Sequence, residues 1–131
     1  MDAPQGKFSG KIAVVTGSSF GIGRAIALEL AAEGATVVVT GRNEARVGET
    51  VQMIEDAGGK AIGRCFDIKE KSEIDAFFQF VKELGGVDIF VSNAGVTKVC
   101  RFLENTEEDL ENILRTNFMG AVYCVQAAGR L

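Results

Sequence analysis

Four short strand-like segments, the first of them a nearly unbroken apolar run, alternate with segments of helical periodicity, and this alternation most constrains the fold. The strand-like segments occupy residues 11–16, 35–40, 60–66 and 87–92. An apolar run of this kind is typical of a strand covered on both faces. Apolar residues recur at helical spacing over residues 22–31, 44–57 and 72–84. Alternating strands and helices predict an α/β fold with a parallel sheet, right-handed crossovers and helices on both faces.

Glycines and a capping pattern mark the predicted helix boundaries. The first three helices should end at Gly34, Gly58 and Gly85, because a glycine just past a helix accepts the left-handed conformation. After the fourth apolar run, residues 106–109 resemble a capping box with Asp in place of Glu. They predict a helix over residues 107–115, and one more helix should follow over residues 117–131.

Length and composition exclude several function classes. The 131 residues suit one domain, and the net charge of −4 gives no electrostatic footprint for nucleic acid. No apolar stretch is long enough to cross a bilayer, so we expect neither a nucleic-acid nor a membrane partner. The chain has no His, and its three cysteines are widely spaced, so we expect no metal site. Reduced thiols favour a cytoplasmic location.

The loop between the first predicted strand and helix is rich in glycine. It reads Thr16-Gly17-Ser18-Ser19-Phe20-Gly21-Ile22-Gly23. N–H groups that open a helix lack intrahelical partners and favour an anion, and glycines let the backbone approach a pyrophosphate. The alternative is a glycine-rich turn that binds nothing. The candidate cofactor-binding residues here are Gly17, Ser18, Ser19, Gly21, Ile22 and Gly23.

The end of the second predicted strand indicates which dinucleotide binds. NAD-binding domains usually place an acid there, but this sequence has Gly41 and Arg42. A guanidinium would pair with a 2′-phosphate, so we predict NADP(H) rather than NAD. The alternative is that Arg42 is a solvated surface charge. Arg24 and Arg46 could assist Arg42 or could equally be helix-surface charges.

Polar and small residues also end the third and fourth predicted strands. Asp67 follows the third strand, where ligands of parallel sheets bind, so it is a candidate for contact with adenine. Its alternative role is the N-cap of the next helix. Asn93, Ala94 and Gly95 end the fourth strand, and their small size would permit close approach to a ribose. The alternative there is an ordinary turn.

In this order and spacing, these motifs resemble the short-chain dehydrogenase/reductase family, in its amino-terminal portion only. The sequence is similar to those of the NADP-preferring 3-oxoacyl-carrier-protein reductases. The resemblance implies an incomplete doubly wound sheet of Rossmann type, with the first four strands and their helices, in one NAD(P)-binding domain over residues 1–131. It also implies hydride transfer between NADP(H) and a small-molecule alcohol or ketone, and a homo-oligomer.

The resemblance assigns Asn117 as the active-site Asn, which supports a helix kink and a water for proton relay. From the residues alone, Asn117 could instead simply begin a helix. The family's catalytic Ser and Tyr-x-x-x-Lys pattern are not in these residues, because the one tyrosine, Tyr123, is followed four positions later by Ala127. We therefore expect a truncated cofactor-binding half that is inactive by itself. The alternatives are a non-catalytic NADP-binding or regulatory module and a methyltransferase-like fold, which Gly41 and Arg42 disfavour.

Overall fold

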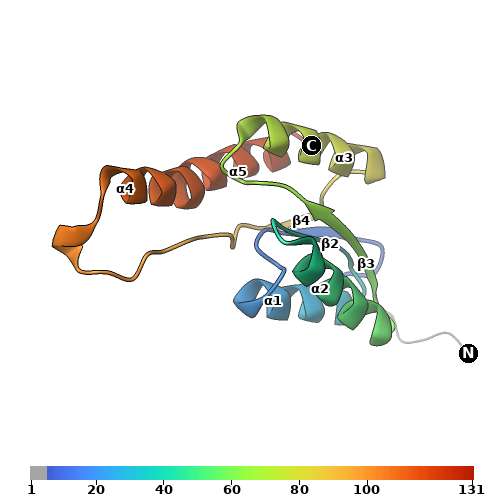
Figure 1. Cartoon of the computed structure of the whole chain (residues 1–131). Helices are drawn as coiled ribbons and strands as arrows, with labels where there is room; N and C mark the ends of the chain where they lie inside the picture. The colour runs from blue at the N-terminus through green and yellow to red at the C-terminus, as the bar shows by residue number, and fades with distance from the viewer. Residues whose placement is uncertain (1–5) are drawn as a thin grey trace, which may run out of the picture.

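A four-stranded parallel sheet forms the centre of the molecule. The computed structural model describes residues 6–131 (Figure 1). The strands are β1 (Ile12–Val15), β2 (Thr36–Gly41), β3 (Lys60–Cys65) and β4 (Ile89–Val91), in the spatial order β3-β2-β1-β4. Each neighbouring pair is parallel. The predicted α/β class is confirmed, and three of the four strands agree with their apolar runs to within one residue at each end.

The fourth strand is shorter than its apolar run. The sequence predicted a strand over residues 87–92, whereas β4 covers only Ile89–Val91. Asp88 accounts for the late start, because its carboxylate Oδ2 accepts a hydrogen bond from the Ile12 N–H at 2.9 Å. A side chain thus supplies the acceptor that a strand backbone would otherwise provide at this point.

Helices cover both faces of the sheet. The helices α1 (Gly21–Ala32) and α2 (Glu44–Asp56) lie on one face, and α3 (Lys71–Leu84) and α5 (Ala121–Gly129) lie on the other (Figure 1). Successive residues of β2 serve the two layers in turn, because Val37 and Val39 face α1 and α2 while Val38 faces α3 and α5. This two-sided burial explains why β1 and β2 contain no polar alternation, whereas the edge strand β3 has exposed positions at Lys60 and Arg64.

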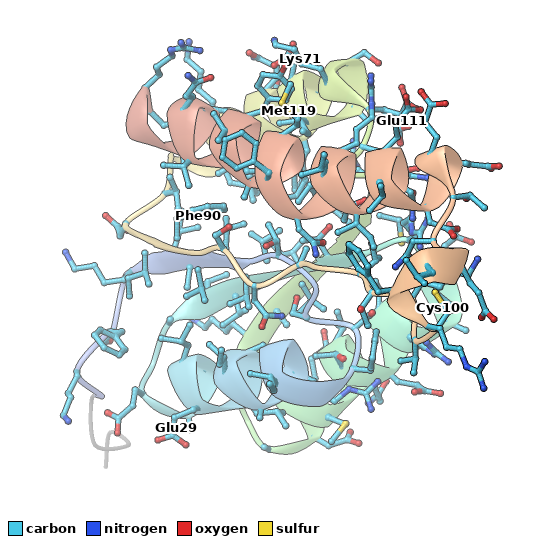
Figure 2. All side chains as sticks on the ribbon, turned by 90° about the vertical axis from the view of Figure 1, so that its left-hand side faces the viewer. Glu29, Lys71, Phe90, Cys100, Glu111 and Met119 are labelled. Atoms are coloured by element: carbon cyan, nitrogen blue, oxygen red, sulfur yellow. The ribbon has the colours of Figure 1, made fainter. Side chains whose placement is uncertain are left out.

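Aromatic residues fill the layer between the sheet and α3. Phe78 of α3 meets Phe90 of β4 edge-on, with ring centroids 5.8 Å apart. Figure 2 shows Phe90 in the space between the strands and the helices above them. The amphipathic face of α3 therefore anchors the edge strand β4 as well as the centre of the sheet.

One interrupted helical rod forms the carboxyl-terminal part. The sequence predicted two helices, over residues 107–115 and 117–131; the structure joins α4 (Glu107–Leu114) and α5 through a π-helical segment at Arg115–Gly120. The capping box of Thr106 and Asp109 starts α4 as predicted. Asn117 lies inside the π segment, so the alternative that it begins a helix is wrong. The extra residue in a π turn lets the rod change its face toward the sheet without a break.

A buried glycine brings the π segment against the loop before α3. A Cβ atom at Gly120 would lie 2.9 Å from both Cγ1 and the carbonyl oxygen of Ile68. Only glycine allows this approach without displacement of the Ile68 backbone.

Within residues 6–131, the structure has no helix whose length and apolar content would let it span a bilayer.

The close approach at Gly120 predicts a specific stability effect. We expect Gly120→Ala to lower the free energy of unfolding by about 1–3 kcal/mol, because the added methyl group overpacks the contact with Ile68. Gly48→Ala is the matched control, since a Cβ in that α2 position would meet nothing within 4 Å. It should raise the free energy by about 0.5–1 kcal/mol. Urea denaturation measures both, and equal effects of the two substitutions would contradict the packing role of Gly120.

Candidate cofactor-binding site

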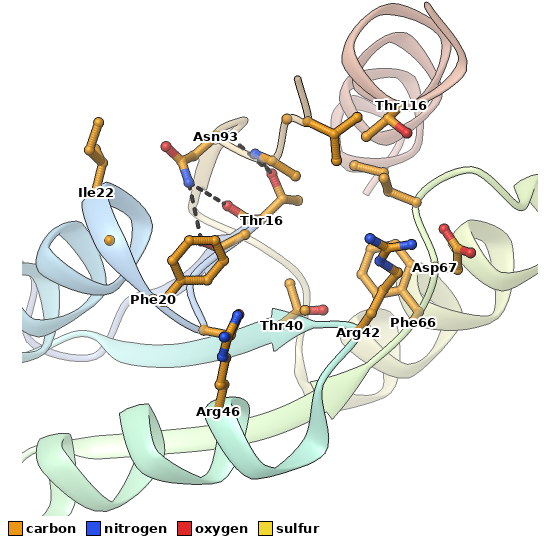
Figure 3. Close-up of a pocket in the computed structure, with 18 residues that line it drawn as sticks. Thr16, Phe20, Ile22, Thr40, Arg42, Arg46, Phe66, Asp67, Asn93 and Thr116 are labelled. Carbon is orange, nitrogen blue, oxygen red and sulfur yellow. Dashed lines mark hydrogen bonds between the residues drawn. The ribbon is translucent and has the colours of Figure 1, made fainter. Parts of the chain in front are cut away.

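A pocket of about 560 Å³ lies at the carboxyl ends of the strands (Figure 3). It joins the loop after β1, the end of β2 and the segments that follow β3 and β4. The predicted binding residues on its wall are Gly17, Ser19, Gly21, Ile22, Arg42, Asp67, Asn93, Ala94 and Gly95. Three other predicted residues, Ser18, Gly23 and Asn117, do not line it. The sheet topology therefore brings four separate chain segments to one site, and Thr116 of the π segment adds a fifth (Figure 3).

Asn93 connects the end of β4 to the glycine-rich loop. Its side-chain Nδ2 donates to the carbonyl oxygens of Thr16 and Gly17 at 3.1 and 3.2 Å. In return, the Thr16 hydroxyl accepts hydrogen bonds from the backbone N–H groups of Asn93 and Ala94, both at 3.0 Å. These reciprocal bonds fix the start of the loop. They also use the Asn93 amide for shaping the site from within.

The next carbonyl groups of the loop also have donors. The Ser18 carbonyl accepts from the Thr50 hydroxyl at 3.0 Å, and the Ser19 carbonyl accepts from the Arg24 guanidinium. The Phe20 carbonyl accepts from the backbone N–H of Arg24 at 3.3 Å. From Thr16 to Phe20, every carbonyl oxygen of the loop is therefore satisfied by a donor of the protein.

The N–H groups show the opposite pattern. In residues 6–131, the backbone N–H groups of Ser19, Phe20, Gly21, Ile22 and Gly23 donate no hydrogen bond to the protein. Four of these residues line the pocket, the exception being Gly23. Free N–H groups beside satisfied carbonyls, at the positive end of a helix, are the arrangement that binds a phosphate.

Gly21 and Gly23 of the loop have different roles. A Cβ at Gly23 would lie 2.1 Å from the Gly17 carbonyl oxygen, so glycine there permits the helix to pack against the loop. Gly21 has a φ of +60° and a Cβ there would meet no protein atom within 4 Å. The protein leaves open space at Gly21, on the pocket side, and a ligand can approach the backbone closely.

Ser18 supports the loop from behind the pocket. It is fully buried, its hydroxyl donates to the Val15 carbonyl at 2.7 Å, and it accepts the Thr40 N–H at 2.9 Å. These bonds join β1 to β2 beneath the loop. The side chain of Ser18 thus shapes the site and does not face a ligand.

Positive charge and one unpaired hydroxyl lie at the β2 side of the pocket. Arg42 and Arg46 are exposed, and the Arg46 guanidinium lies 5.1 Å from the ring centroid of Phe20. Figure 3 shows both guanidinium groups beside the pocket. Thr40 Oγ1 is the one buried side-chain nitrogen or oxygen without a partner in the part of the chain that the structure describes. A buried hydroxyl that lines a pocket and lacks a partner suits a polar ligand.

Asp67 lies on the pocket wall and forms a local turn. Its Oδ1 accepts the Lys69 N–H at 3.0 Å, whereas the N-cap of α3 is Glu70. The alternative role of Asp67 as the N-cap of this helix is therefore wrong. Its carboxylate remains beside the pocket.

Asn117 binds the segment that follows β4. Its Oδ1 accepts the Val96 N–H at 2.7 Å and its Nδ2 donates to the Val96 carbonyl at 2.8 Å. A second link lies further along, where Lys98 and Asp109 form an ion pair at 2.8 Å. That contact lowers the pKa of Asp109 and raises the pKa of Lys98 from their ordinary values. The wall after β4 is thus attached to α4 and to the π segment.

The comparison with known families decides the assignment. A family model described as short chain dehydrogenase matches residues 11–131. The chain belongs to the short-chain dehydrogenase family.

Curated relatives and solved structures agree with this assignment. The chain is 39% identical over 123 residues to an L-2,3-butanediol dehydrogenase of Corynebacterium glutamicum, covering 92% of this chain and 48% of that protein. It is 38% identical over 128 residues to a 3beta-hydroxysteroid dehydrogenase of Mediterraneibacter gnavus, covering 96% and 46%. A crystal structure of a dehydrogenase/reductase from Sinorhizobium meliloti superposes with a TM-score of 0.88 at 39% identity, covering 93% and 49%. The chain spans about half the length of these relatives.

Sequence reasoning missed several parts of this short-chain dehydrogenase site. The hydroxyl of Thr16 holds the loop to the segment after β4, and Arg24 and Thr50 contact the loop from α1 and α2. Of these side chains only Arg24 was considered, as a possible phosphate ligand or a surface charge. A signal for Thr50 exists in the sequence, because it stands at helical spacing with Val47 and Ile54 on the buried face of α2. One hydroxyl in an otherwise apolar stripe needs a hydrogen-bond partner.

The remaining reactive groups do not form a second site. Burial raises the pKa of the Cys124 thiol to about 12, so this thiol is inert at neutral pH. Cys65, Cys100 and Cys124 are all free thiols. Tyr123 is half-buried, with the Lys71 ammonium 5.7 Å from its ring centroid. No group of three or more metal-ligating side chains occurs in residues 6–131.

The contact between Asn117 and Val96 can be tested by hydrogen exchange. We expect Asn117→Ala to speed exchange of the Val96 amide by about tenfold, because the substitution removes both hydrogen bonds to Val96, at about 0.5–1.5 kcal/mol each. Asn112→Ala is the control, since Asn112 is an exposed residue of α4. Unchanged Val96 exchange in Asn117→Ala would contradict the role of this contact.

Proposed function

We propose that this chain is the NADP-binding part of an oxidoreductase that transfers hydride between NADP(H) and a small-molecule alcohol or ketone. One observation carries the proposal: a single pocket has free amide N–H groups at the α1 end and the guanidinium of Arg42 at the β2 end. No carboxylate stands at the end of β2 to repel a 2′-phosphate. The two ends thus match the two phosphate-bearing parts of NADP.

In the proposal, successive groups of the cofactor contact successive parts of the pocket. Loop amides around Gly21 and Ile22 would bind the diphosphate, and Arg42 would bind the 2′-phosphate, with the hydroxyl of Thr40 nearby. Asp67 would contact adenine. Asn93, Ala94 and Gly95 would lie along a ribose. Their small size, and the hydrogen bonds that hold Asn93 against Thr16, leave room for the sugar to approach the backbone.

The chemistry divides between the cofactor and the protein. Bound NADP(H) supplies hydride-transfer capacity. In the proposal, Asn117 serves as the active-site Asn of the family, and its place in the π segment supports that role. Its bonds to Val96 hold the wall after β4 and the helical rod in a fixed relation. Alcohol and ketone substrates accord with the relatives, among them a diacetyl reductase of Staphylococcus epidermidis, 38% identical over 119 residues.

The proposal also covers assembly and location. We propose a homo-oligomer, which is supported by exposed apolar side chains on the helical rod: Leu114 is 59% exposed and Phe118 is 61% exposed. Such large apolar groups in one region are typical of a protein contact. A cytoplasmic location accords with the three free thiols.

Arg42 provides the sharpest test of cofactor choice. We expect Arg42→Ala to weaken NADPH binding by about 10- to 100-fold, since a hydrogen bond to a charged group contributes about 1.5–3 kcal/mol. NADH binding should change little. Arg64→Ala is the control, because Arg64 carries the same charge but lies over the Phe80 ring, 4.4 Å from its centroid. Titration calorimetry measures the six affinities of the unchanged chain and the two variants, and an equal loss for NADPH and NADH in Arg42→Ala would refute the 2′-phosphate role.

Binding and turnover should separate in this chain. The 131 residues lack a Tyr-x-x-x-Lys pattern, so no tyrosine is followed four positions later by the lysine that assists proton transfer in that pattern. We expect saturable NADPH binding, but no NADPH oxidation above background when diacetyl is added. The absorbance of NADPH reports turnover. Oxidation that depends on both diacetyl and the chain would show that these residues contain a complete active site.

A further inference from the structure

We propose that Arg24 and Thr50 are positioning residues for the cofactor diphosphate, acting through the backbone orientation of the glycine-rich loop. The inference rests on the proposed function, since it concerns how the same pocket recognises a dinucleotide. Neither side chain lines the pocket. Arg24 of α1 donates to the Ser19 carbonyl, and Thr50 of α2 donates to the Ser18 carbonyl.

A short chain of hydrogen bonds connects α1, α2 and the glycine-rich loop. The Arg24 Nε donates to the Thr50 hydroxyl at 2.9 Å. That hydroxyl in turn donates to the Ser18 carbonyl at 3.0 Å, the nearer of its two acceptors, the other being the Arg46 carbonyl at 3.3 Å. The Arg24 Nη2 donates directly to the Ser19 carbonyl. Thr50 is fully buried and the Arg24 side chain is only 23% exposed, so water competes weakly for these bonds. The guanidinium is therefore partly buried and bound to the loop, and is not simply the solvated helix-surface charge that the sequence left open.

Peptide geometry converts these bonds into a direction for the N–H groups. In a trans peptide the carbonyl and the following N–H lie in one plane and point in opposite directions. When the Ser18 carbonyl points toward Thr50, the N–H of Ser19 must point the other way. The same holds for the Ser19 carbonyl and the N–H of Phe20. Because Ser19 and Phe20 line the pocket, their N–H groups are available to an anion there.

Without these donors, the two peptide groups could rotate. A rotated peptide would present a carbonyl oxygen to the phosphate oxygens, and an attraction would become a repulsion. The positive charge of Arg24 alone does not explain the arrangement, because Glu49 accepts from the same Nη2 at 3.1 Å and offsets that charge. Orientation, and not net charge, is thus the effect to be tested.

The experiment compares three ligands on matched variants of the chain. Thr50→Val keeps the shape of the side chain and removes its hydroxyl; Arg24→Lys keeps the charge and removes the two-pronged donor. We expect each to weaken NADPH and NADH equally, by about fivefold to tenfold, in line with the loss of one or two hydrogen bonds. Adenosine 2′-monophosphate, which carries the 2′-phosphate but no diphosphate, should bind as it does to the unchanged chain. Glu49→Gln is the control and should alter none of the three affinities.

Hydrogen exchange without any ligand gives a second readout. In Thr50→Val the amides of Ser19 and Phe20 should exchange at altered rates, while those of the distant helix α3 should not. Circular dichroism establishes that each variant is folded, and two different substitutions guard against the failure of one.

The outcomes separate the two proposals. Unchanged NADPH and NADH affinities in folded Thr50→Val and Arg24→Lys would overturn the positioning role alone. A loss that is larger for NADPH than for NADH, or that extends to adenosine 2′-monophosphate, would also overturn it, because the defect would then lie at the 2′-phosphate. Failure of the unchanged chain to bind either dinucleotide would overturn the proposed function itself.

Discussion

The junction between β1 and β4 determines the geometry of the whole pocket. The two strands are parallel neighbours, yet Thr16 and Asn93 are separated by 77 residues of chain. The Thr16 hydroxyl is buried and accepts two N–H groups from the far segment, while Asn93 returns two hydrogen bonds to the near one. Both the glycine-rich loop and the wall after β4 leave the sheet at this point. Any error in the pairing of β1 with β4 would therefore misplace both walls together.

The loop that leaves this junction is satisfied on one side only. From Thr16 to Phe20 its carbonyl groups all have donors inside the protein, whereas its N–H groups from Ser19 to Gly23 make no hydrogen bond within residues 6–131. A bare, buried N–H would cost about 1–3 kcal/mol, so such groups persist only where water or a ligand reaches them. The fold meets that condition at the open end of the sheet. Because the donors are already oriented before an anion arrives, little conformational freedom is lost on binding.

The parts that could be predicted from the sequence are those set by local patterns. The covered strands β1 and β2 produce nearly unbroken apolar runs, and the capping box and glycines mark helix ends, so the layers follow from the sequence. The π segment could not be predicted in this way, because it depends on the contact of Gly120 with Ile68 and of Asn117 with Val96. Arg24 was ambiguous for the same reason: its partners on the loop and on α2 are brought together only by folding.

The net charge of the chain limits which interactions can attract an anionic ligand. The net charge of −4 opposes the approach of an anionic cofactor at long range. Attraction must therefore arise from groups close to the ligand. The Debye length is about 10 Å at 0.1 M salt, and salt screens exposed charges more than buried ones. Loop amides are fixed dipoles, whereas Arg42 is an exposed full charge, so the two ends of the pocket should respond differently to ionic strength. Arg46 differs again, because its contact with the Phe20 ring holds the guanidinium against the loop and leaves Arg42 the freer cation at this edge.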